Sequence, residues 1–192
     1  MREGEQAYIV FPMVEGSDDA SRPAAVDEHE RLSREVFPDL RVGLVHGRMS
    51  PDEKESSMAL FRRGETQVLV ATTVIEVGVD VPNATVMLVD GADVFGLAQL
   101  HQLRGRVGRG PAQSVCLLLA DDPSDTARQR LDAVVGTSDG MELAELDLRL
   151  RGPGDYFGLR QSGIVDRFRF ARRVDGSVLT DACDAAGEVM AR

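Results

Sequence analysis

The sequence is poor in cysteine, tryptophan and lysine. It contains two Cys, no Trp and, among 22 basic residues, a single Lys at position 54. Cys116 and Cys183 lie far apart, without a Cys-x-x-Cys pair or a His at metal-ligand spacing. The sequence therefore indicates neither a zinc site nor a disulfide framework, and we expect both cysteines to be small core residues.

Long hydrophobic runs are also missing. The longest apolar stretches, Gln67–Ala71 and Val115–Ala120, are far shorter than the roughly 20 residues that cross a bilayer. The first residues, MREGEQAYIVF, lack the basic, apolar and small-residue segments of a secretory signal. We therefore expect a cytoplasmic protein with no membrane partner.

The composition is that of a folded protein, and its charge is unevenly distributed. The 192 residues are 43% hydrophobic and 28% charged, with a net charge of −10. Such a charge argues against nucleic acid, whose phosphates attract Lys and Arg. However, one segment of the chain has a local charge of +5, from seven Arg and two Asp. These residues are Arg149, Arg151, Arg160, Arg167, Arg169, Arg172, Arg173, Asp155 and Asp166.

Apolar runs alternate with amphipathic segments along the first part of the chain. The pattern predicts strands over Gln6–Phe11, Leu40–Val45, Gln67–Thr72, Thr85–Asp90 and Ser114–Ala120, and helices over Ala24–Val36, Pro51–Arg63, Leu97–Gly105 and from Ser124 or Asp125 onward. Because each strand is apolar throughout, we expect an α/β fold in which a parallel sheet is sandwiched by helices.

The last part of the chain has a different character. The pattern predicts a helix over Asp139–Arg151, an irregular glycine-rich stretch over Gly152–Gly163 and a closing helix over Val178–Ala191. We therefore expect two domains: residues 1–137 as the α/β domain, and residues 138–192 as a small helical hairpin with a C-terminal helix.

Polar loops adjoin several of the predicted strands. His46–Met49 and Thr72–Asp80 each follow a strand, at the carboxyl edge where parallel sheets bind ligands. A third stretch, Gln102–Gly110, precedes a strand and contains Arg104, Arg106 and Arg109 among glycines. Guanidinium groups bind phosphate oxygens in pairs, and the neighbouring glycines permit close approach.

Plainer interpretations remain open for some of these residues. His46 is also consistent with a solvated loop, and Asp80 with a loop acid or a helix cap. The glycines at 105, 108 and 110 follow the order GxxGxG, so they do not match a dinucleotide fingerprint. Arg104 and the cluster Arg167–Arg173 are consistent either with DNA contact or with pairing to the abundant acids.

Two elements of nucleotide hydrolysis are missing from the sequence. It has no GxxxxGK[ST] loop to hold phosphates and no strand-borne DExH or DExD element for Mg²⁺. A chain with candidate arginine fingers and no phosphate loop is expected to form one wall of a cleft whose other wall lies elsewhere.

These residues resemble the superfamily 2 helicases, specifically the second RecA-like lobe of RecG-type ATP-dependent DNA helicases. The similarity is carried by QAYIVFPMVE, TTVIEVGVDVP and QLHQLRGRVGRG, and extends almost throughout His46–Gly110. The stretch Asp147–Gly163, with its RGPG, is similar to the translocation motif of that family. Transcription-repair coupling factors share part of this pattern and are an alternative, as is a non-catalytic nucleic-acid-binding module.

The resemblance implies roles for particular residues. Arg106 and Arg109 would act as catalytic arginines that reach ATP, with Gln102, Gly78 and Asp80 also at the nucleotide. The residues implied at DNA are His46, Gly47, Thr72, Thr73, Arg149, Arg151 and Gln161. ATP and Mg²⁺ would be bound mainly by a first lobe that is absent here. The implied partners are branched or forked DNA, that first lobe and an N-terminal wedge domain of the same longer protein.

Overall fold

The computed structural model of the chain describes residues 4–12, 21–72 and 81–151, without the side chains of 21–24 and 151. Its elements are β1 (Gln6–Phe11), α1 (Ser21–Arg31), η1 (Leu32–Val36), β2 (Val42–Val45), α2 (Pro51–Arg62), β3 (Val68–Thr72), β4 (Ala84–Val89), η3 (Ala92–Val94), α3 (Leu97–Arg104), β5 (Val115–Leu118), α4 (Asp125–Gly136) and α5 (Gly140–Arg151). Each strand and helix predicted for these residues is present. The predicted glycine-rich stretch and closing helix lie outside the described residues.

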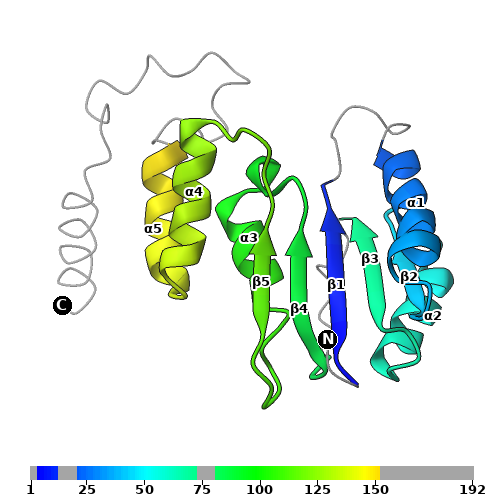
Figure 1. Ribbon diagram of the computed structural model, residues 1–192. Coiled ribbons are helices and arrows are strands. Elements are labelled where there is room, and N and C mark those ends of the chain that lie inside the picture. Colours follow the sequence, from blue (N-terminus) through cyan, green and yellow to red (C-terminus); the bar gives the residue numbers. More distant parts are fainter. Residues whose placement is uncertain (1–3, 13–20, 73–80, 152–192) are drawn as a thin grey trace, which may run out of the picture. The chain divides into compact units, whose positions relative to one another are not determined.

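The five strands form one parallel sheet in the order β2-β3-β1-β4-β5 (Figure 1). β1 lies at its centre, with Ala7 paired to Val68 of β3 and to Val86 of β4. A central strand of a parallel sheet is buried on both faces, which explains why β1 and β3 are almost entirely apolar. The predicted α/β fold is confirmed.

Helices cover both faces of this sheet. On one face, Leu32 of η1 packs with Ile9, Val68 and Val70 in a buried cluster. On the other face, Phe61 of α2 lies against Tyr8, with ring centroids 4.8 Å apart. Successive residues of a strand point to opposite faces, so Tyr8 and Ile9 place α2 and η1 on opposite sides.

The cover is incomplete at β5. Val115, Leu117 and Leu119 are each close to half exposed. Leu117 pairs with Leu88 of β4, which lies on the face packed by η1. On that face α1 packs on β2 and β3, at the far side of the sheet from β5.

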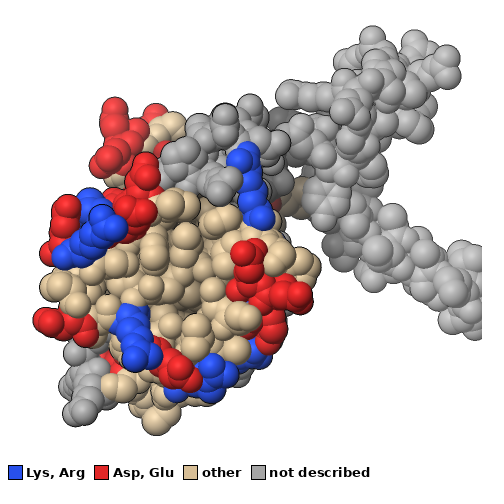
Figure 2. Space-filling model, turned by 90° about the vertical axis from the view of Figure 1, so that its right-hand side faces the viewer, with Lys and Arg blue, Asp and Glu red and all other residues tan. Residues whose placement is uncertain are grey.

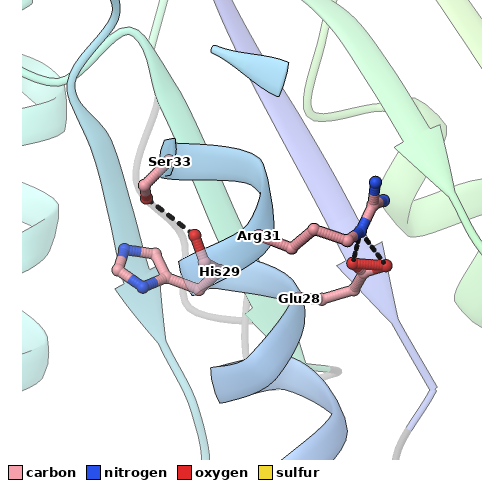
Figure 3. Close-up of polar contacts among 4 residues, drawn as sticks. All are labelled: Glu28, His29, Arg31 and Ser33. Carbon is pink, nitrogen blue, oxygen red and sulfur yellow. Dashed lines mark hydrogen bonds and ion pairs between the residues drawn. The ribbon is translucent and has the colours of Figure 1, made fainter. Parts of the chain in front are cut away.

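The helix predicted over 24–36 changes its pitch near its end. α1 ends at Arg31 and continues as the π-helical turn η1, in which the Phe37 N–H donates to the Leu32 carbonyl at 2.7 Å. The Ser33 hydroxyl donates to the His29 carbonyl at 2.7 Å (Figure 3), a side-chain bond that competes with regular helical pairing. His29 Nε2 lies 3.0 Å from the Val42 carbonyl oxygen and ties α1 to the edge strand β2.

A buried glutamine joins β1 to the end of α2. The side-chain amide of Gln6 donates to the carbonyl oxygens of Phe61 and Thr66, at 2.6 and 2.7 Å. Gln6 is only 1% exposed, so water cannot replace these bonds. The single polar residue of an otherwise apolar strand therefore holds the turn that connects α2 to β3.

Replacing Gln6 with alanine is expected to lower the free energy of unfolding by about 3 kcal/mol, because two buried carbonyls lose their donor. Urea unfolding followed by circular dichroism measures this change. Gln113 is exposed, so Gln113→Ala is the matched control and should stay within about 0.5 kcal/mol of the original chain. Equal stability of the two variants would contradict this role of Gln6.

The division of the chain into compact units falls inside α5. One unit comprises Met1–Ala144 and the other Glu145–Arg192. The boundary predicted between residues 137 and 138 stays a prediction. Within the described ranges, no helix is both long and apolar enough to cross a membrane.

Candidate functional site

The predicted site residues lie at opposite edges of the sheet. His46 follows β2 and Thr72 ends β3, so both lie at the carboxyl edge. The run Gln102–Gly110 leads from α3 into β5 and lies at the amino edge, where a Cβ atom on Gly110 would be 2.5 Å from the Pro82 carbonyl oxygen just before β4. The arginine run is therefore not gathered with the loops that leave the strands.

The turn after β2 is held by three bonds. The Met49 N–H donates to the His46 carbonyl at 3.2 Å, and the Met49 sulfur accepts from the His46 N–H at 3.4 Å. The ammonium group of Lys54, on α2, donates to the Gly47 carbonyl at 2.8 Å. The one lysine of the chain thus fixes a turn in which His46 is half-buried and Gly47 is exposed.

The same turn leads directly into the N-terminus of α2. The Ser50 hydroxyl accepts from the Glu53 N–H at 3.3 Å, and the Glu53 carboxylate accepts from the Ser50 N–H at 2.8 Å. This is the capping box that Ser50, Pro51 and Glu53 predict from sequence. It orients the start of α2 beside His46.

The stability that the Ser50–Glu53 capping box contributes is expected to depend on pH. The backbone N–H and then the side chain of Ser50 lower the pKa of Glu53 below its ordinary value, with a smaller contribution from His46. Because the folded pKa is the lower one, the cap stabilises the fold above the ordinary glutamate pKa and is lost as the pH falls through the lowered pKa. A carboxyl NMR titration should place Glu53 below the range of model peptides, and Ser50→Ala should move it back upward. Titration of Glu53 at the ordinary value in the unsubstituted chain would contradict this arrangement.

Thr72 differs from the other carboxyl-edge candidates in its burial. It is the last residue of β3 and is only 3% exposed. Its hydroxyl oxygen is buried and finds no hydrogen-bond partner among the residues that the structure describes. The DNA contact implied for Thr72 stays a prediction.

Helix α3 presents Gln102 and leads into the arginine run. Leu97, Leu100 and Leu103 of α3 are buried, while Gln102 is exposed. The apolar residues anchor one side of the helix and leave Gln102 on the other, near the start of the run.

The arginine run is shaped by its backbone. The Arg106 N–H donates to the Leu103 carbonyl at 3.0 Å, which tightens the end of α3. Gly108 then turns the chain with a φ of 82°, in the region that favours glycine. The Arg109 Nε–H donates to the Gly105 carbonyl at 2.9 Å. Arg109 is exposed and Arg106 half-buried, so both guanidinium groups belong to one short, glycine-shaped surface loop.

The glycines of this run are not equivalent. A Cβ atom on Gly105 would meet only ordinary contacts at 3.5 Å, whereas one on Gly108 would lie 2.7 Å from the Ser114 hydroxyl oxygen. Gly110 packs against the Pro82 backbone itself. Close approach is therefore required at Gly108 and Gly110, and not at Gly105.

Arg104 contacts the end of helix α4. Its guanidinium donates to the carbonyl oxygens of Val134 and Thr137, with 2.7 Å to Thr137. It also lies 3.0 Å from Nδ1 of His101. Arg104 is thus bound to backbone at the end of α4, rather than to an acidic side chain.

Several predicted residues cannot be placed in this geometry. Thr73, Gly78, Asp80 and Gln161 lie outside the described residues, as do Cys183 and Arg167–Arg173. Arg149 on α5 is largely exposed and pairs with Glu145 at 3.4 Å. Arg151 ends α5, and its side chain is not described.

The side of the molecule that carries α1, β2 and α2 is not a basic surface. Figure 2 shows acidic and basic side chains interspersed around its rim, with uncharged residues between them. Four ion pairs join arginines of α1, η1, α2 and the residue after α2 to carboxylates: Arg31–Glu28, Arg34–Glu30, Arg62–Glu55 and Arg63–Glu65. Exposed pairs of this kind contribute little stability, but they offset the arginines that would otherwise attract phosphate here.

No metal site is formed by the residues that can be placed. Within the ranges 4–12, 21–72 and 81–151, no three His, Cys, Asp or Glu side chains gather as ligands. Cys116 is a half-buried free thiol. Burial raises its pKa, and the charge of Arg104 partly opposes that rise.

Comparisons with known proteins identify the family of the chain. Residues 1–111 match the helicase conserved C-terminal domain, and residues 137–192 match domain 3, C-terminal, of the ATP-dependent DNA helicase RecG. The chain is 52% identical over 189 residues to ATP-dependent DNA helicase RecG of Synechocystis sp., covering 98% of this chain and 23% of that protein. It is 57% identical over 168 residues to the protein of the same name from Mycobacterium tuberculosis, covering 83% of this chain and 23% of that protein.

A solved structure gives the same result. The chain matches the structure of RecG bound to a three-way DNA junction with a TM-score of 0.66 and 48% identity, over 79% of this chain and 19% of that one. The chain spans about a quarter of the length of these curated relatives, 23% for each of the two named. The chain therefore belongs to the helicase conserved C-terminal domain family and, within it, to the RecG-type ATP-dependent DNA helicases.

Proposed function

We propose that this chain is the C-terminal motor lobe of an ATP-dependent helicase that remodels branched DNA, such as stalled forks and Holliday junctions, in recombination and repair. The relatives are named ATP-dependent DNA helicases, and one of them is described bound to a three-way DNA junction. The proposal includes a cytoplasmic location, where a motor of this kind would meet its DNA.

The observation that carries the proposal is the arginine run at the amino edge of the sheet. Arg106 and Arg109 lie on a loop whose shape depends on Gly108 and Gly110. Five N–H donors on each guanidinium suit the oxygens of a phosphate chain. Because the sequence has no phosphate-binding loop of its own, these arginines would serve a nucleotide bound by another lobe.

The guanidinium donors of Arg106 and Arg109 suit the phosphates of ATP, and the residues that the structure describes gather no ligand set for Mg²⁺. Bound ATP supplies the phosphoryl group whose transfer to water drives the motor. In this proposal Arg109 stabilises the charge that develops on the γ-phosphate, and Arg106 holds the phosphates in position. Gln102, exposed on α3, would orient the run, while Gly78 and Asp80 would lie near the nucleotide and its ribose. The Mg²⁺ ion would be held by acidic residues of the first lobe.

The DNA-facing side of the proposal involves the opposite edge of the sheet and α5. His46 and Gly47 are supported by a turn that Lys54 and the capping box hold open to solvent. Thr72 and Thr73 would contribute through the backbone that follows β3, because the Thr72 side chain is buried.

The second proposed DNA contact lies beyond the sheet. Arg149 and Arg151 occupy the last turn of α5, and with Gln161 they would contact DNA as the translocation element. This assignment rests on the resemblance. Of the two arginines, Arg149 is exposed and the side chain of Arg151 lies outside the description.

The experiment that tests the proposal is a DNA-dependent ATPase assay. The longer protein that carries this chain should hydrolyse ATP when a forked DNA is added, and linear duplex should stimulate it less. This chain alone, which lacks a phosphate-binding loop, should show no hydrolysis under the same conditions. If forked DNA leaves the longer protein inactive, the proposed function is wrong.

A further inference from the structure

One face of the sheet is open to solvent at strands β4 and β5. On β5 and directly after it, the side chains of Val115, Leu117 and Leu119 are 46, 44 and 47% exposed. Their neighbours on β4 are also apolar and only half-buried: Val86 pairs with Val115, and Leu88 pairs with Leu117. These side chains form one apolar surface, here called the β4–β5 patch. A contiguous apolar surface of this kind marks a docking site.

The path of the chain explains why the β4–β5 patch is open. From β1 the chain crosses through α1 to β2, and it returns in the opposite direction through α2 to β3 and through α3 to β5. Because such crossovers are right-handed, α1 lies on one face, and α2 and α3 lie on the other. The patch shares the face of α1, which packs at the far end of the sheet on β2 and β3 (Figure 1). Helix α4, which follows β5, packs on α3 and η3 instead.

The sequence contains a segment whose pattern suits this patch. Residues 178–191, for which the sequence predicts a helix, lie outside the described residues. Apolar residues recur at helical spacing along one side of the predicted helix, at Leu179, Cys183, Ala186 and Met190. Acidic residues fall on the opposite side, at Asp181, Asp184 and Glu188. Such a helix can bury its apolar side without burying a charge.

The dimensions of the predicted helix and of the β4–β5 patch agree. Val115 and Leu119 lie about 13 Å apart at the rise of a strand, and Leu179 and Met190 about 16 Å apart at the rise of an α-helix. One helix, about 10 Å wide, covers two strands that are about 4.8 Å apart. The stretch 152–177 reaches about 85 Å when extended, which exceeds the width of a domain of about 150 residues.

We propose that residues 178–191 form a helix that docks on the β4–β5 patch of the same chain, with Leu179, Cys183 and Met190 toward the sheet. The proposal goes beyond the proposed function, because this contact needs neither nucleotide nor DNA. A second copy of the chain would also bury the patch, but each copy has a net charge of −10, and like charges oppose self-association. A segment of the same chain is favoured further by its high effective concentration.

The test is disulfide formation between the patch and the segment in the full chain of 192 residues. Leu117→Cys is made together with Cys116→Ala, so that Cys183 is the only other thiol. The control is Leu60→Cys in the same background, because Leu60 is 38% exposed on α2, on the opposite face of the sheet. A disulfide needs Cβ atoms within about 4.5 Å, so on mild oxidation we expect the intramolecular bond to Cys183 to form at least about tenfold faster in Leu117→Cys. Mass spectrometry of unreduced peptides measures this rate.

Three outcomes of the oxidation would overturn the proposal. Equal rates in Leu117→Cys and Leu60→Cys would show that the segment has no preference for the patch. Disulfides only between two chains would assign the patch to a second copy. A folded Leu117→Cys chain that forms no bond to Cys183 would leave the patch to another protein. If Leu117→Cys does not unfold cooperatively, Val115→Cys takes its place with the same three outcomes.

Hydrogen exchange tests the same contact without a new cysteine. Leu179→Asp puts a charge on the apolar side of the predicted helix, whereas Thr180→Asp puts the same charge next to it, away from that side. We expect Leu179→Asp to speed amide exchange over residues 115–119 at least about tenfold. Thr180→Asp should leave these rates at the wild-type value, and β3 should stay protected in both proteins. Equal exchange over residues 115–119 in the two variants would overturn the proposal.

Discussion

Replacing Arg109 with alanine is expected to lower fork-stimulated ATP hydrolysis by the longer helicase by about 10³-fold or more, the range for loss of an arginine finger. Arg109 is exposed on the glycine-shaped run, where its Nε–H donates to the Gly105 carbonyl. The substitution removes the donors that would stabilise the charge of the transferring phosphoryl group. Steady-state ATPase kinetics measure this loss directly.

Arg128→Ala is the control for Arg109→Ala, because it removes an exposed arginine far along the chain from the run. Its ATPase rate should stay within about twofold of the wild-type rate. Fork DNA should bind the Arg109→Ala protein about as tightly as the wild type, since this residue is not among the proposed DNA contacts. ATPase rates that are equal in the Arg109→Ala and Arg128→Ala proteins would remove Arg109 from the nucleotide site.

The Gly110→Ala substitution is expected to have the second largest effect. Its Cβ atom would lie 2.5 Å from the Pro82 carbonyl oxygen. Because the Pro82 carbonyl is backbone and cannot rotate away as a flexible side chain would, either the run or the turn before β4 must shift. We expect a loss of about 1–3 kcal/mol in the free energy of unfolding. A run displaced by about an ångström should also cost on the order of 10²-fold in ATPase rate.

Gly105→Ala is the matched control for Gly110→Ala within the same run. Gly105 has a φ of −67° and a Cβ atom there would meet only contacts at 3.5 Å. An alanine should therefore leave both the unfolding free energy and the ATPase rate close to their wild-type values. Gly110→Ala should therefore be more damaging than Gly105→Ala in both measurements. If Gly105→Ala is the more damaging substitution, the described shape of the run is wrong.

Short-range signals predicted the elements of this fold well. Ser50, Pro51 and Glu53 predict the start of α2 because a capping box depends only on residues three apart. The apolar runs of β1 and β3 predict buried parallel strands for the same local reason. The π-helical turn at the end of α1, where the Ser33 hydroxyl bonds to the His29 carbonyl, was not predicted.

Contacts between distant residues could not be predicted in this way. Gln6 binds carbonyls 55 and 60 residues away, and Arg104 binds carbonyls 30 and 33 residues away. A glutamine in an apolar strand was a signal that could have been noticed, since a buried amide needs partners. Arg104 precedes a glycine and Arg106 precedes a valine in the same basic run. Their neighbours in the sequence therefore do not indicate that the two side chains differ in their contacts.

The candidate site residues lie at two different edges of the sheet. Polar loops at His46 and Thr72 lie at the carboxyl edge, whereas the arginine run lies beside Pro82 and Ser114 at the amino edge. In the proposed function, one lobe would offer separate edges to DNA and to nucleotide.

In the proposed function, Arg109 stabilises the transferring phosphoryl group of ATP held by another lobe. The most direct test compares binding of ADP with binding of ADP–aluminium fluoride, a mimic of that transition state, to fork-bound wild-type and Arg109→Ala proteins. We expect the two proteins to bind ADP with equal affinity. We expect the Arg109→Ala protein to bind the mimic about 10²-fold or more weakly than the wild type. Equal affinity of both proteins for the mimic would contradict it.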